Sequence, residues 1–336
     1  MNKYQEILAE IKNAKHIVIT SHKSPDGDSI GSSLGLYHFI KKIGGNAVVC
    51  HPDPAPEFIR WVDGVEDILT YVEHPNEVTT NFEKADLIFS LDYNATDRVG
   101  PDMQKLLEAS NAKKIMIDHH LYPQDYCQIT VSHTEVCSTS QLVCEFILQT
   151  GNELIVDEKV GTPLYLGIVT DSGSFRFPTV QPRTHEIIAI LLKSGVKHYQ
   201  VHENTFDNNT LDRLRLQGFA LSQKLEIDND YKFALISLTA EDLENYPHQK
   251  GDTEGFVNIA LSIKGMKIAV FLSEKDGAVK ISFRSKGSDN PVNKLASDHF
   301  EGGGHANAAG GISHLSVSET IEKIKSLIPI YFSKSI

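Results

Sequence analysis

The sequence predicts an α/β protein: an N-terminal domain with a parallel sheet and helices on both faces, then a smaller C-terminal α/β domain, with a cleft between them. Its 336 residues exceed the size of one ordinary core and suit two domains. Over residues 1–195, short apolar runs rich in Val and Ile alternate with helical patterns, which indicates parallel strands and crossover helices. Beyond residue 226 apolar runs return after a polar stretch, which indicates a second sheet. We therefore expect domains at 1–195 and 227–336, joined by a linker and linker helix at 196–226.

The predicted elements of the N-terminal domain follow one another in strand–helix order. The runs that predict strands are 16–20, 46–50, 86–92, 113–118 and 127–131. The helical patterns are 29–43, 101–110, 138–150, 157–170 and 183–193. In such a sheet ligands bind beyond the carboxyl ends of the strands, so we expect a site in the loops that follow them.

The second half begins with a leucine repeat that predicts the linker helix. The repeating residues, expected on one face, are Leu211, Leu214, Leu221 and Leu225. Apolar runs predict strands at 231–238, 266–274 and 278–285. A helix, a Gly-rich loop at 301–311 and a final helix over 318–331 complete the prediction.

Composition and charge exclude several classes of protein. Hydrophobic residues make up 40% and charged residues 23%, which is typical of a globular protein. The net charge of −12 argues against binding long duplex nucleic acid, whose affinity comes mainly from neutralised phosphates, but allows a short anion in a locally positive pocket. No apolar run reaches the roughly 20 residues of a membrane helix, and the charged N-terminus lacks a signal-peptide centre. We expect no membrane association and a cytoplasmic location.

The four cysteines are predicted to be buried thiols, because they have apolar neighbours and no C-x-x-C spacing. They are Cys50, Cys127, Cys137 and Cys144.

A loop that follows the first predicted strand carries unusual charge. The segment "SHKSPDGDS" places His22, Asp26 and Asp28 in a short stretch that Pro25 and Gly27 force to turn. Like charges held close together repel and raise one another's pKa unless a positive charge lies between them. Matching partners elsewhere in the chain are therefore needed to explain this loop.

Further carboxylates and histidines end apolar segments of the same domain. The segments "LIFSLD", "KKIMIDHH" and "LYLGIVTDSGSF" end in such residues, which we expect at the same edge of the sheet. The resulting cluster of four carboxylates and two imidazoles would be destabilising without a counter-charge, and two divalent cations would neutralise it. The cluster comprises His22, Asp26, Asp28, Asp92, His119 and Asp171.

The donor types indicate the metal and the chemistry. Carboxylate and imidazole donors without a thiolate favour Mn²⁺ over structural Zn²⁺, with Mg²⁺ and Co²⁺ as alternatives. Two such ions lower the pKa of a shared water and stabilise an in-line displacement at phosphorus, in which hydroxide attacks. Each residue alone also has a structural reading; Asp28, for example, could be only the N-cap of the helix that follows.

The ordered segments "HKSPDGDS", "SLD", "DHH" and "TDSGSF" resemble the DHH phosphoesterase family. "RSKG" at 284–287 and "EGGGHANAAGG" at 301–311 resemble its C-terminal DHH-associated domain. In length and layout the chain is similar to the family's oligoribonucleases, or nanoRNases, which also remove phosphate from 3′-phosphoadenosine 5′-phosphate.

The resemblance implies a role for each matching residue. His22 and Asp26 would hold one metal ion, Asp28, His119 and Asp171 the other, and Asp92 would bridge them. Asp118 would orient a histidine and His120 would face the substrate phosphate, so the implied catalytic residues are Asp92, Asp118, His119 and His120. The implied substrate contacts are Arg98, His120, Arg284, Ser285, Gly302, Gly303, Gly304 and His305, with a solvated surface arginine as the alternative for Arg98.

The residue types of the C-terminal motif also predict phosphate binding without the family resemblance. Consecutive glycines let a backbone approach a ligand and offer N–H groups to an anion, and Arg284 suits bidentate phosphate recognition. A flexible turn is the structural alternative. The family often has a basic residue after the histidine, where this chain has Ala306.

We therefore expect an enzyme that hydrolyses short oligoribonucleotides, dinucleotides or 3′-phosphoadenosine 5′-phosphate with two divalent ions, most consistently Mn²⁺. The alternatives are a manganese-dependent inorganic pyrophosphatase and a nucleotide sensor without catalysis. The oligomeric state stays open, with a homodimer as one option.

Overall fold

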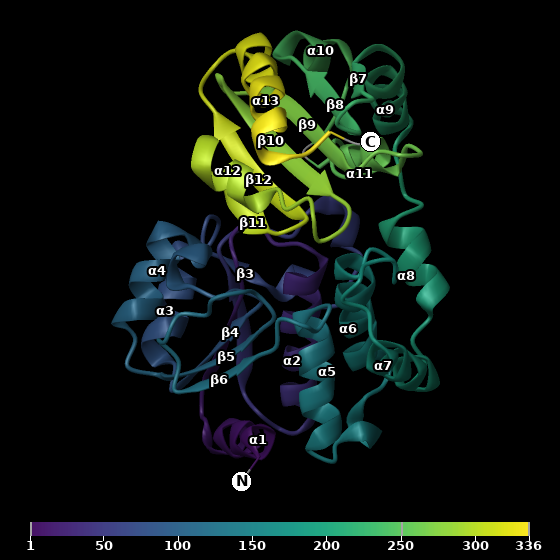
Figure 1. The fold of residues 1–336 in the computed structure, drawn as a ribbon. Coiled ribbons are helices and arrows are strands. Elements are labelled where there is room, and N and C mark those ends of the chain that lie inside the picture. Colours follow the sequence, from purple (N-terminus) through teal and green to yellow (C-terminus); the bar gives the residue numbers. More distant parts are fainter. Residues whose placement is uncertain (1, 250, 335–336) are drawn as a thin grey trace. The chain divides into compact units, whose positions relative to one another are not determined.

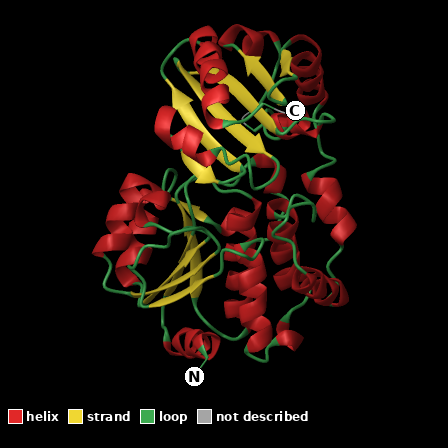
Figure 2. Ribbon diagram, viewed as in Figure 1, coloured by secondary structure: helices red, strands yellow, loops and turns green. Residues whose placement is uncertain are grey.

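The computed structural model describes residues 2–249 and 251–334, and of His305 only the backbone. Contacts divide the chain into two compact units, Met1–Asn208 and Asn209–Ile336. Each unit has its own sheet with helices packed on it (Figures 1 and 2). The predicted α/β fold class, with a parallel N-terminal sheet, is confirmed.

The described strands of the first unit form one six-stranded sheet in the order β3-β2-β1-β4-β5-β6. Every neighbouring pair is parallel. The strands are β1 (Ile17–Thr20), β2 (Ala47–His51), β3 (Leu69–Thr70), β4 (Leu87–Leu91), β5 (Lys113–Asp118) and β6 (Ile129–Ser132). The short strand β3 was not predicted from the sequence.

The strand order creates one natural place for a ligand. The chain runs outward from β1 through β2 to β3, and then returns to continue on the other side of β1 with β4. The order therefore reverses between β1 and β4, and in open parallel sheets ligands bind beyond the carboxyl ends of the strands at such a point. The loops after β1 and β4 are those that carry His22, Asp26, Asp28 and Asp92.

Alternating side chains bury the two faces of this sheet under different helices. Ile17 and Ile19 belong to the core with α1, α2, α5, α6 and α7, whereas Val18 belongs to the core with α3 and α4. Figure 1 shows these two helix layers on either side of the sheet. The helices are α1 (Lys3–Asn13), α2 (Gly27–Lys42), α3 (Pro75–Lys84), α4 (Gly100–Ala109), α5 (Thr139–Gln149), α6 (Glu158–Asp171), α7 (Pro182–Lys193) and α8 (His198–Thr205), with 3₁₀ turns at η1 (Glu57–Ile59), η2 (Val65–Asp67), η3 (Thr96–Val99) and η4 (Glu153–Ile155).

The second unit has a mixed six-stranded sheet in the order β11-β12-β10-β9-β8-β7. One face packs on α12 and α13, and the other on α9, α10 and α11. Its elements are α9 (Leu211–Gln223), β7 (Leu225–Asp228), β8 (Phe233–Leu238), α10 (Ala240–Asn245), α11 (Phe256–Ser262), β9 (Ile268–Lys275), β10 (Ala278–Ser285), α12 (Asn293–His299), β11 (Gly303–His305), β12 (Ala308–Ser313) and α13 (Val317–Tyr331).

Two predictions for this unit were wrong. The Gly-rich segment is not a loop but the antiparallel pair β11 and β12, because its glycines let two backbones approach closely. The predicted leucine face is wrong in its first half: Leu221 and Leu225 pack partly buried against the core, but Leu211 and Leu214 are 62% and 48% exposed, and Leu216 with Ala220 is fully buried instead. The buried pair lies one turn apart, and packing against β8 selected it.

The prediction of buried thiols is confirmed, since all four cysteines are free and buried. Within the described ranges, no helix combines the length and the apolar character that crossing a bilayer requires.

Candidate metal centre and active site

The loop after β1 is held by the start of α2. Asp26 caps this helix, because its Oδ1 accepts hydrogen bonds from the backbone N–H groups of Asp28 and Ser29, both at 3.0 Å. The reading of Asp28 as the N-cap is therefore wrong: the cap lies two residues earlier, and Asp28 is free to point elsewhere. His22 is 6% exposed, and its Nδ1 lies 2.9 Å from the carbonyl oxygen of Lys23. That contact leaves its Nε2 directed at carboxylates.

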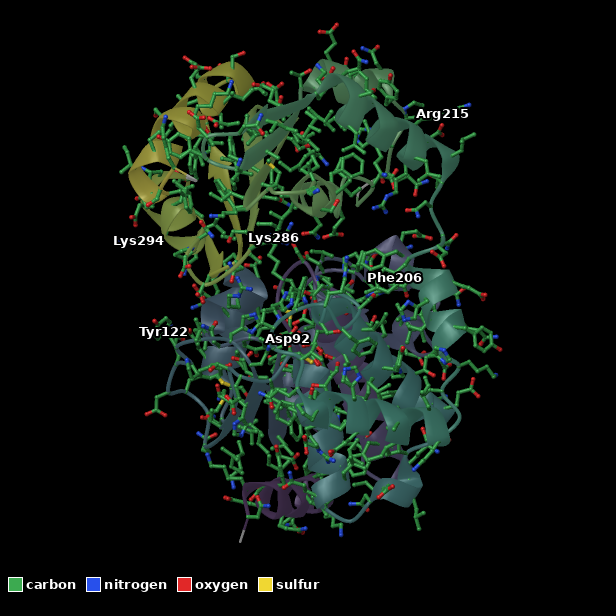
Figure 3. The ribbon with its side chains drawn as sticks, turned by 45° about the vertical axis from the view of Figure 1, so that its right-hand side comes forward. Asp92, Tyr122, Phe206, Arg215, Lys286 and Lys294 are labelled. Carbon is green, nitrogen blue, oxygen red and sulfur yellow. The ribbon has the colours of Figure 1, made fainter. Side chains whose placement is uncertain are left out.

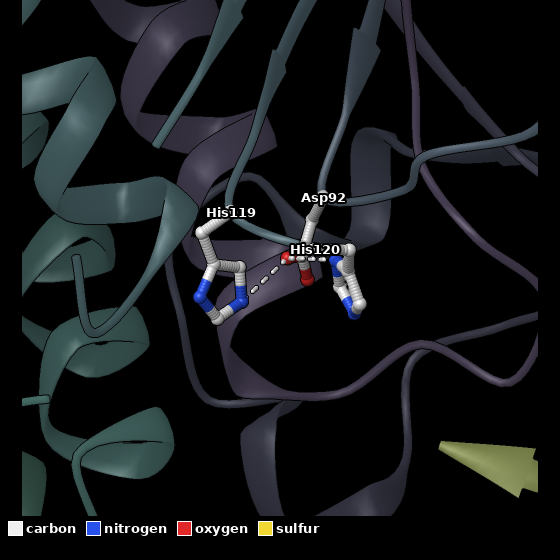
Figure 4. Close-up of side chains that lie close together, drawn as sticks. All are labelled: Asp92, His119 and His120. Carbon is white, nitrogen blue, oxygen red and sulfur yellow. Dashed lines mark ion pairs between the residues drawn. The ribbon is translucent and has the colours of Figure 1, made fainter. Parts of the chain in front are cut away.

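Asp92 lies at the centre of the cluster. It follows β4 directly, is 2% exposed, and has a positive φ of 64°, which non-glycine residues adopt rarely and mostly where the surroundings enforce it. Its Oδ2 lies 3.4 Å from Nε2 of His22, and its Oδ1 lies 3.5 Å from Nε2 of His119. Figure 4 shows the rings of His119 and His120 on opposite sides of its carboxylate.

The end of β5 positions two histidines differently. Asp118 is fully buried, and its Oδ1 lies 2.7 Å from Nδ1 of His120 while its Oδ2 accepts from the His120 backbone N–H at 3.1 Å. Nδ1 of His119 lies 3.2 Å from the carbonyl oxygen of Val136. Each histidine is therefore held through Nδ1, as is usual for imidazoles that use Nε2 for a ligand. The loop continues to Tyr122, which is 87% exposed at the margin of the first unit, whereas Asp92 lies inside it (Figure 3).

Asp171 comes from the end of α6. Its Oδ2 lies 3.2 Å from Nε2 of His119, which also lies 3.9 Å from Oδ2 of Asp28. After α6, Gly173, Ser174 and Phe175 all have positive φ, so the chain turns back sharply. Phe175 packs against the core, which anchors this turn beside Asp171.

These side chains form three groups whose donor atoms lie within 4.8 Å of one another. The groups are His22, Asp26 and Asp92; Asp28, His119 and Asp171; and Asp92, His119 and His120. Donors about 2.0–2.2 Å from one cation lie roughly 3–3.5 Å apart. The spacings between imidazole and carboxylate in the first two groups are 3.2–3.9 Å, so small shifts would suit a divalent cation. These groups could hold a metal ion.

The charges in the cluster depend on one another. Burial alone would lower the pKa of His22 and His119, but the neighbouring carboxylates raise the pKa of both well above the usual value. Burial would raise the pKa of Asp92, but the imidazoles of His119, His22 and His120 lower it well below the usual value. For Asp28, burial and the charges of Asp92 and Asp171 act together and raise the pKa. The imidazolium protons thus lie where a cation would otherwise balance the carboxylates.

One part of the cluster was not found from the sequence. The backbone N–H groups of Thr139 and Ser140, the first residues of α5, donate to the carboxylate of Asp28 at 2.6 and 2.8 Å. The only signal was "STS" at the start of a predicted helix, which is an ordinary capping pattern.

The other predicted contacts lie in two places. Arg98 is exposed in η3, and its carbonyl oxygen accepts from the Lys23 N–H at 2.7 Å, which joins the two loops beside the cluster. Arg284 and Ser285 end β10 in the second unit, where Oγ of Ser285 accepts from Nδ2 of Asn307 at 2.8 Å. The glycine residues 302–304 lie before and within β11. The side chain of His305 lies outside the described part of the chain.

The chain is similar to known proteins over nearly its whole length. Residues 16–168 match the family described as "DHH family, N-terminal domain", and residues 239–331 match the "DHHA1 domain". The bifunctional oligoribonuclease and PAP phosphatase NrnA of Thermus thermophilus is 30% identical over 95% of this chain and 91% of its own length. The probable enzyme of the same name from Streptococcus mutans is 28% identical over 98% of this chain and 100% of its own length.

One solved structure is also similar to this chain over nearly its full length. The exopolyphosphatase-related protein of Bacteroides fragilis is 40% identical, with a TM-score of 0.95 over 98% of this chain and 96% of that chain. Together with the matched domains and the relatives, this shows that the chain belongs to the DHH family of phosphoesterases, which are hydrolases, and carries a DHHA1 domain after the DHH domain.

Proposed function

We propose that this protein hydrolyses short oligoribonucleotides, including dinucleotides, and removes phosphate from 3′-phosphoadenosine 5′-phosphate. The observation that carries the proposal is the convergence of His22, Asp92 and His119 at the carboxyl ends of β1, β4 and β5. The names of the relatives support this substrate class, because these proteins match both units of the chain and are of comparable length.

We propose two divalent cations as cofactors, with Mn²⁺ favoured. His22 and Asp26 would hold one, Asp28, His119 and Asp171 the other, and Asp92 would serve both, because its two oxygens face different histidines. Carboxylate and imidazole donors without thiolate suit Mn²⁺. When bound, the ions would neutralise the carboxylates, attract the phosphate and lower the pKa of a bound water.

The chain's own residues would orient the substrate. His120 is held by Asp118 through Nδ1, which orients its ring, and its Nε2 would contact the scissile phosphate or give a proton to the leaving oxygen. Arg98 is exposed beside the His22 loop and would contact a phosphate at the rim. Asp118 would act through His120 and not on the substrate itself.

The second unit would supply substrate contacts of its own. Arg284 supplies a guanidinium, Ser285 a hydroxyl, and the glycine segment 302–304 with His305 would add further polar groups. Support comes from the sheet itself, in which Arg284 pairs with Ala308 of β12, next to the glycine strand β11. Free thiols at all four cysteines suit a cytoplasmic location, which we also propose.

A substrate panel tests this proposal. Initial rates with Mn²⁺ are compared for RNAs of two to ten nucleotides, 3′-phosphoadenosine 5′-phosphate and pyrophosphate, with EDTA as the metal-free control. We expect the shortest RNAs and the bisphosphate to react fastest and EDTA to stop turnover. Pyrophosphate as the preferred substrate, or binding of nucleotides with no product, would contradict the proposal and favour a pyrophosphatase or a sensor.

A further inference from the structure

The first residues of α5 donate hydrogen bonds to carboxylates of the cluster, although none of these residues was predicted to belong to the site. Ser138 is the N-cap, and its Oγ accepts from the N–H of Gln141 at 3.1 Å. The next two N–H groups, which have no partner within a helix, both donate to Asp28, at 2.6 and 2.8 Å. The positive end of the helix dipole therefore lies against a buried carboxylate, which it stabilises in the ionised form.

Thr139 makes a second contact that reaches another carboxylate. Its side chain is fully buried, and its Oγ1 lies 3.1 Å from Oδ1 of Asp92. A single residue thus donates to Asp28 through its backbone and to Asp92 through its hydroxyl. These carboxylates belong to different metal-binding groups, so Thr139 connects the two groups.

The neighbouring helix is shaped to allow this approach. A Cβ placed on Gly167 of α6 would collide with Oγ of Ser140 and come within 2.7 Å of Oδ1 of Asp28. Only a residue without a side chain lets α5 and α6 close together around Asp28. The arrangement is therefore built by three helices, α2, α5 and α6, and does not depend on one surface contact.

Asp92 needs a fixed orientation for the proposed bridging role. Its backbone has a φ of 64°, and its carboxylate must direct one oxygen to His22 and the other to His119. A carboxylate can rotate about its terminal bond, which has a broad torsional preference. A hydroxyl donor on Oδ1 selects the orientation in which Oδ2 remains toward His22.

We propose that Thr139 is a positioning residue that orients the bridging carboxylate of Asp92 for cation binding. The inference rests on the metal centre proposed above. Thr139 touches neither substrate nor reacting atoms in this account, and it acts through Asp92. Loss of such an outer partner typically weakens metal affinity by 10–100-fold.

The test uses the full chain and Mn²⁺ alone, with calorimetric titration as the readout. Thr139→Val keeps the shape of the side chain and removes its hydroxyl, whereas Thr139→Ser keeps the hydroxyl. Thr139→Ala is a second variant without the hydroxyl, in case the valine variant fails to fold. Thr205→Val is the matched control, because Thr205 is a buried threonine of the same unit whose hydroxyl has no hydrogen-bond partner among the described residues.

We expect Mn²⁺ to bind Thr139→Val and Thr139→Ala about 10–100-fold more weakly, Thr139→Ser within about threefold of the unmodified chain, and Thr205→Val unchanged. At saturating Mn²⁺, Thr139→Val should lower kcat for a short RNA and leave KM unchanged. If Thr139→Val and Thr139→Ala bind Mn²⁺ as tightly as the unmodified chain, the role proposed for Thr139 is overturned while the metal centre stands. The same follows if Thr139→Ser binds Mn²⁺ as weakly as these two variants. An unmodified chain that binds no Mn²⁺ overturns the metal centre itself, whatever the substrate is.

Discussion

Nε2 of His119 lies 3.5 Å from Oδ1 of Asp92, although the two residues are 27 positions apart in the chain and follow different strands, β5 and β4. This spacing exceeds a hydrogen bond between nitrogen and oxygen, yet it is close to the separation of two donors on one cation. The strand order explains the pairing, because β4 and β5 are parallel neighbours whose carboxyl ends meet at one edge.

Replacing Asp92 with Asn should stop turnover without unfolding the chain. An amide keeps the shape but cannot balance two cations or pair with the imidazoles of His22 and His119. We expect the rate on a short RNA with Mn²⁺ to fall by more than the roughly 100-fold that loss of an outer partner costs. Asp97→Asn, an exposed aspartate in η3, is the control, and its rate should not change. Full activity of Asp92→Asn with a native circular dichroism spectrum would refute the assignment.

Replacing Arg284 with Gln should chiefly weaken substrate binding. Burial lowers the pKa of Arg284, and part of its hydrogen-bonding capacity is used on the carbonyl oxygen of Phe283 at 2.9 Å. Losing a charge-assisted contact of about 1.5–3 kcal/mol should raise KM by roughly 10–100-fold and leave kcat nearly unchanged. Lys280→Gln, on the exposed side of the same strand, is the control. A large fall in kcat at unchanged KM would show that Arg284 takes part in the chemical step.

Alanine substitutions at the three consecutive glycines should distinguish a structural role in the sheet from a role in substrate binding. A Cβ on Gly302 or Gly304 would collide with carbonyl oxygens of β12, and Gly304 has a φ of 137°, whereas a Cβ on Gly303 meets nothing within 4 Å. Gly302→Ala and Gly304→Ala should each lower the free energy of unfolding by about 1–3 kcal/mol in urea titrations. Gly303→Ala should keep the stability and raise KM if its backbone approaches a nucleotide. Equal stability loss in all three variants would contradict this division.

The metal-free chain should lose stability as the pH rises. The pKa values of His22 and His119 are raised in the folded state, so their pairing with carboxylates stabilises the fold fully below the unfolded value of about 6.5 and is lost as the pH passes their folded values. The raised pKa of Asp28 acts in the same direction. With EDTA, the free energy of unfolding should therefore be lower at pH 9 than at pH 6.5.

Mn²⁺ should reverse this trend, because its ligands must be deprotonated and its affinity rises with pH. Urea titrations at both pH values, with and without the metal, check both signs. His133→Gln, an exposed histidine beside Glu135, is the control and should follow the unmodified chain. A metal-free chain that is as stable at pH 9 as at pH 6.5 would argue against the charge arrangement described for the cluster.

The sequence was sufficient where the signal is local. The strands β5 and β10 begin and end at the predicted residues: β5 carries a continuous apolar run, and β10 alternates apolar and polar residues, both of which are typical of strands. The meeting of His22, Asp92 and His119 was predictable because strand ends in a parallel sheet share one edge. The residue types alone then indicated a cation site.

The sequence was insufficient where partners are distant or patterns ambiguous. Asp26 and Asp28 are both good caps, and only the structure shows that Asp26 fills this role while the carboxylate of Asp28 accepts from the start of α5. The bond from Thr139 to Asp28 spans 111 residues, so no local pattern reports it. The strands β11 and β12 were missed because glycine disfavours strands, and pairing across the sheet overrides that preference.

The central claim is that residues from separate loops hold a pair of divalent cations at the carboxyl edge of the first sheet. Crystals grown with Mn²⁺ and measured at the manganese absorption edge test it most directly. We predict two anomalous peaks, one among His22, Asp26 and Asp92 and the other among Asp28, His119 and Asp171, with Asp92 next to both. A map without a peak at this edge, or with a single peak held by Asp92, His119 and His120, would contradict the account.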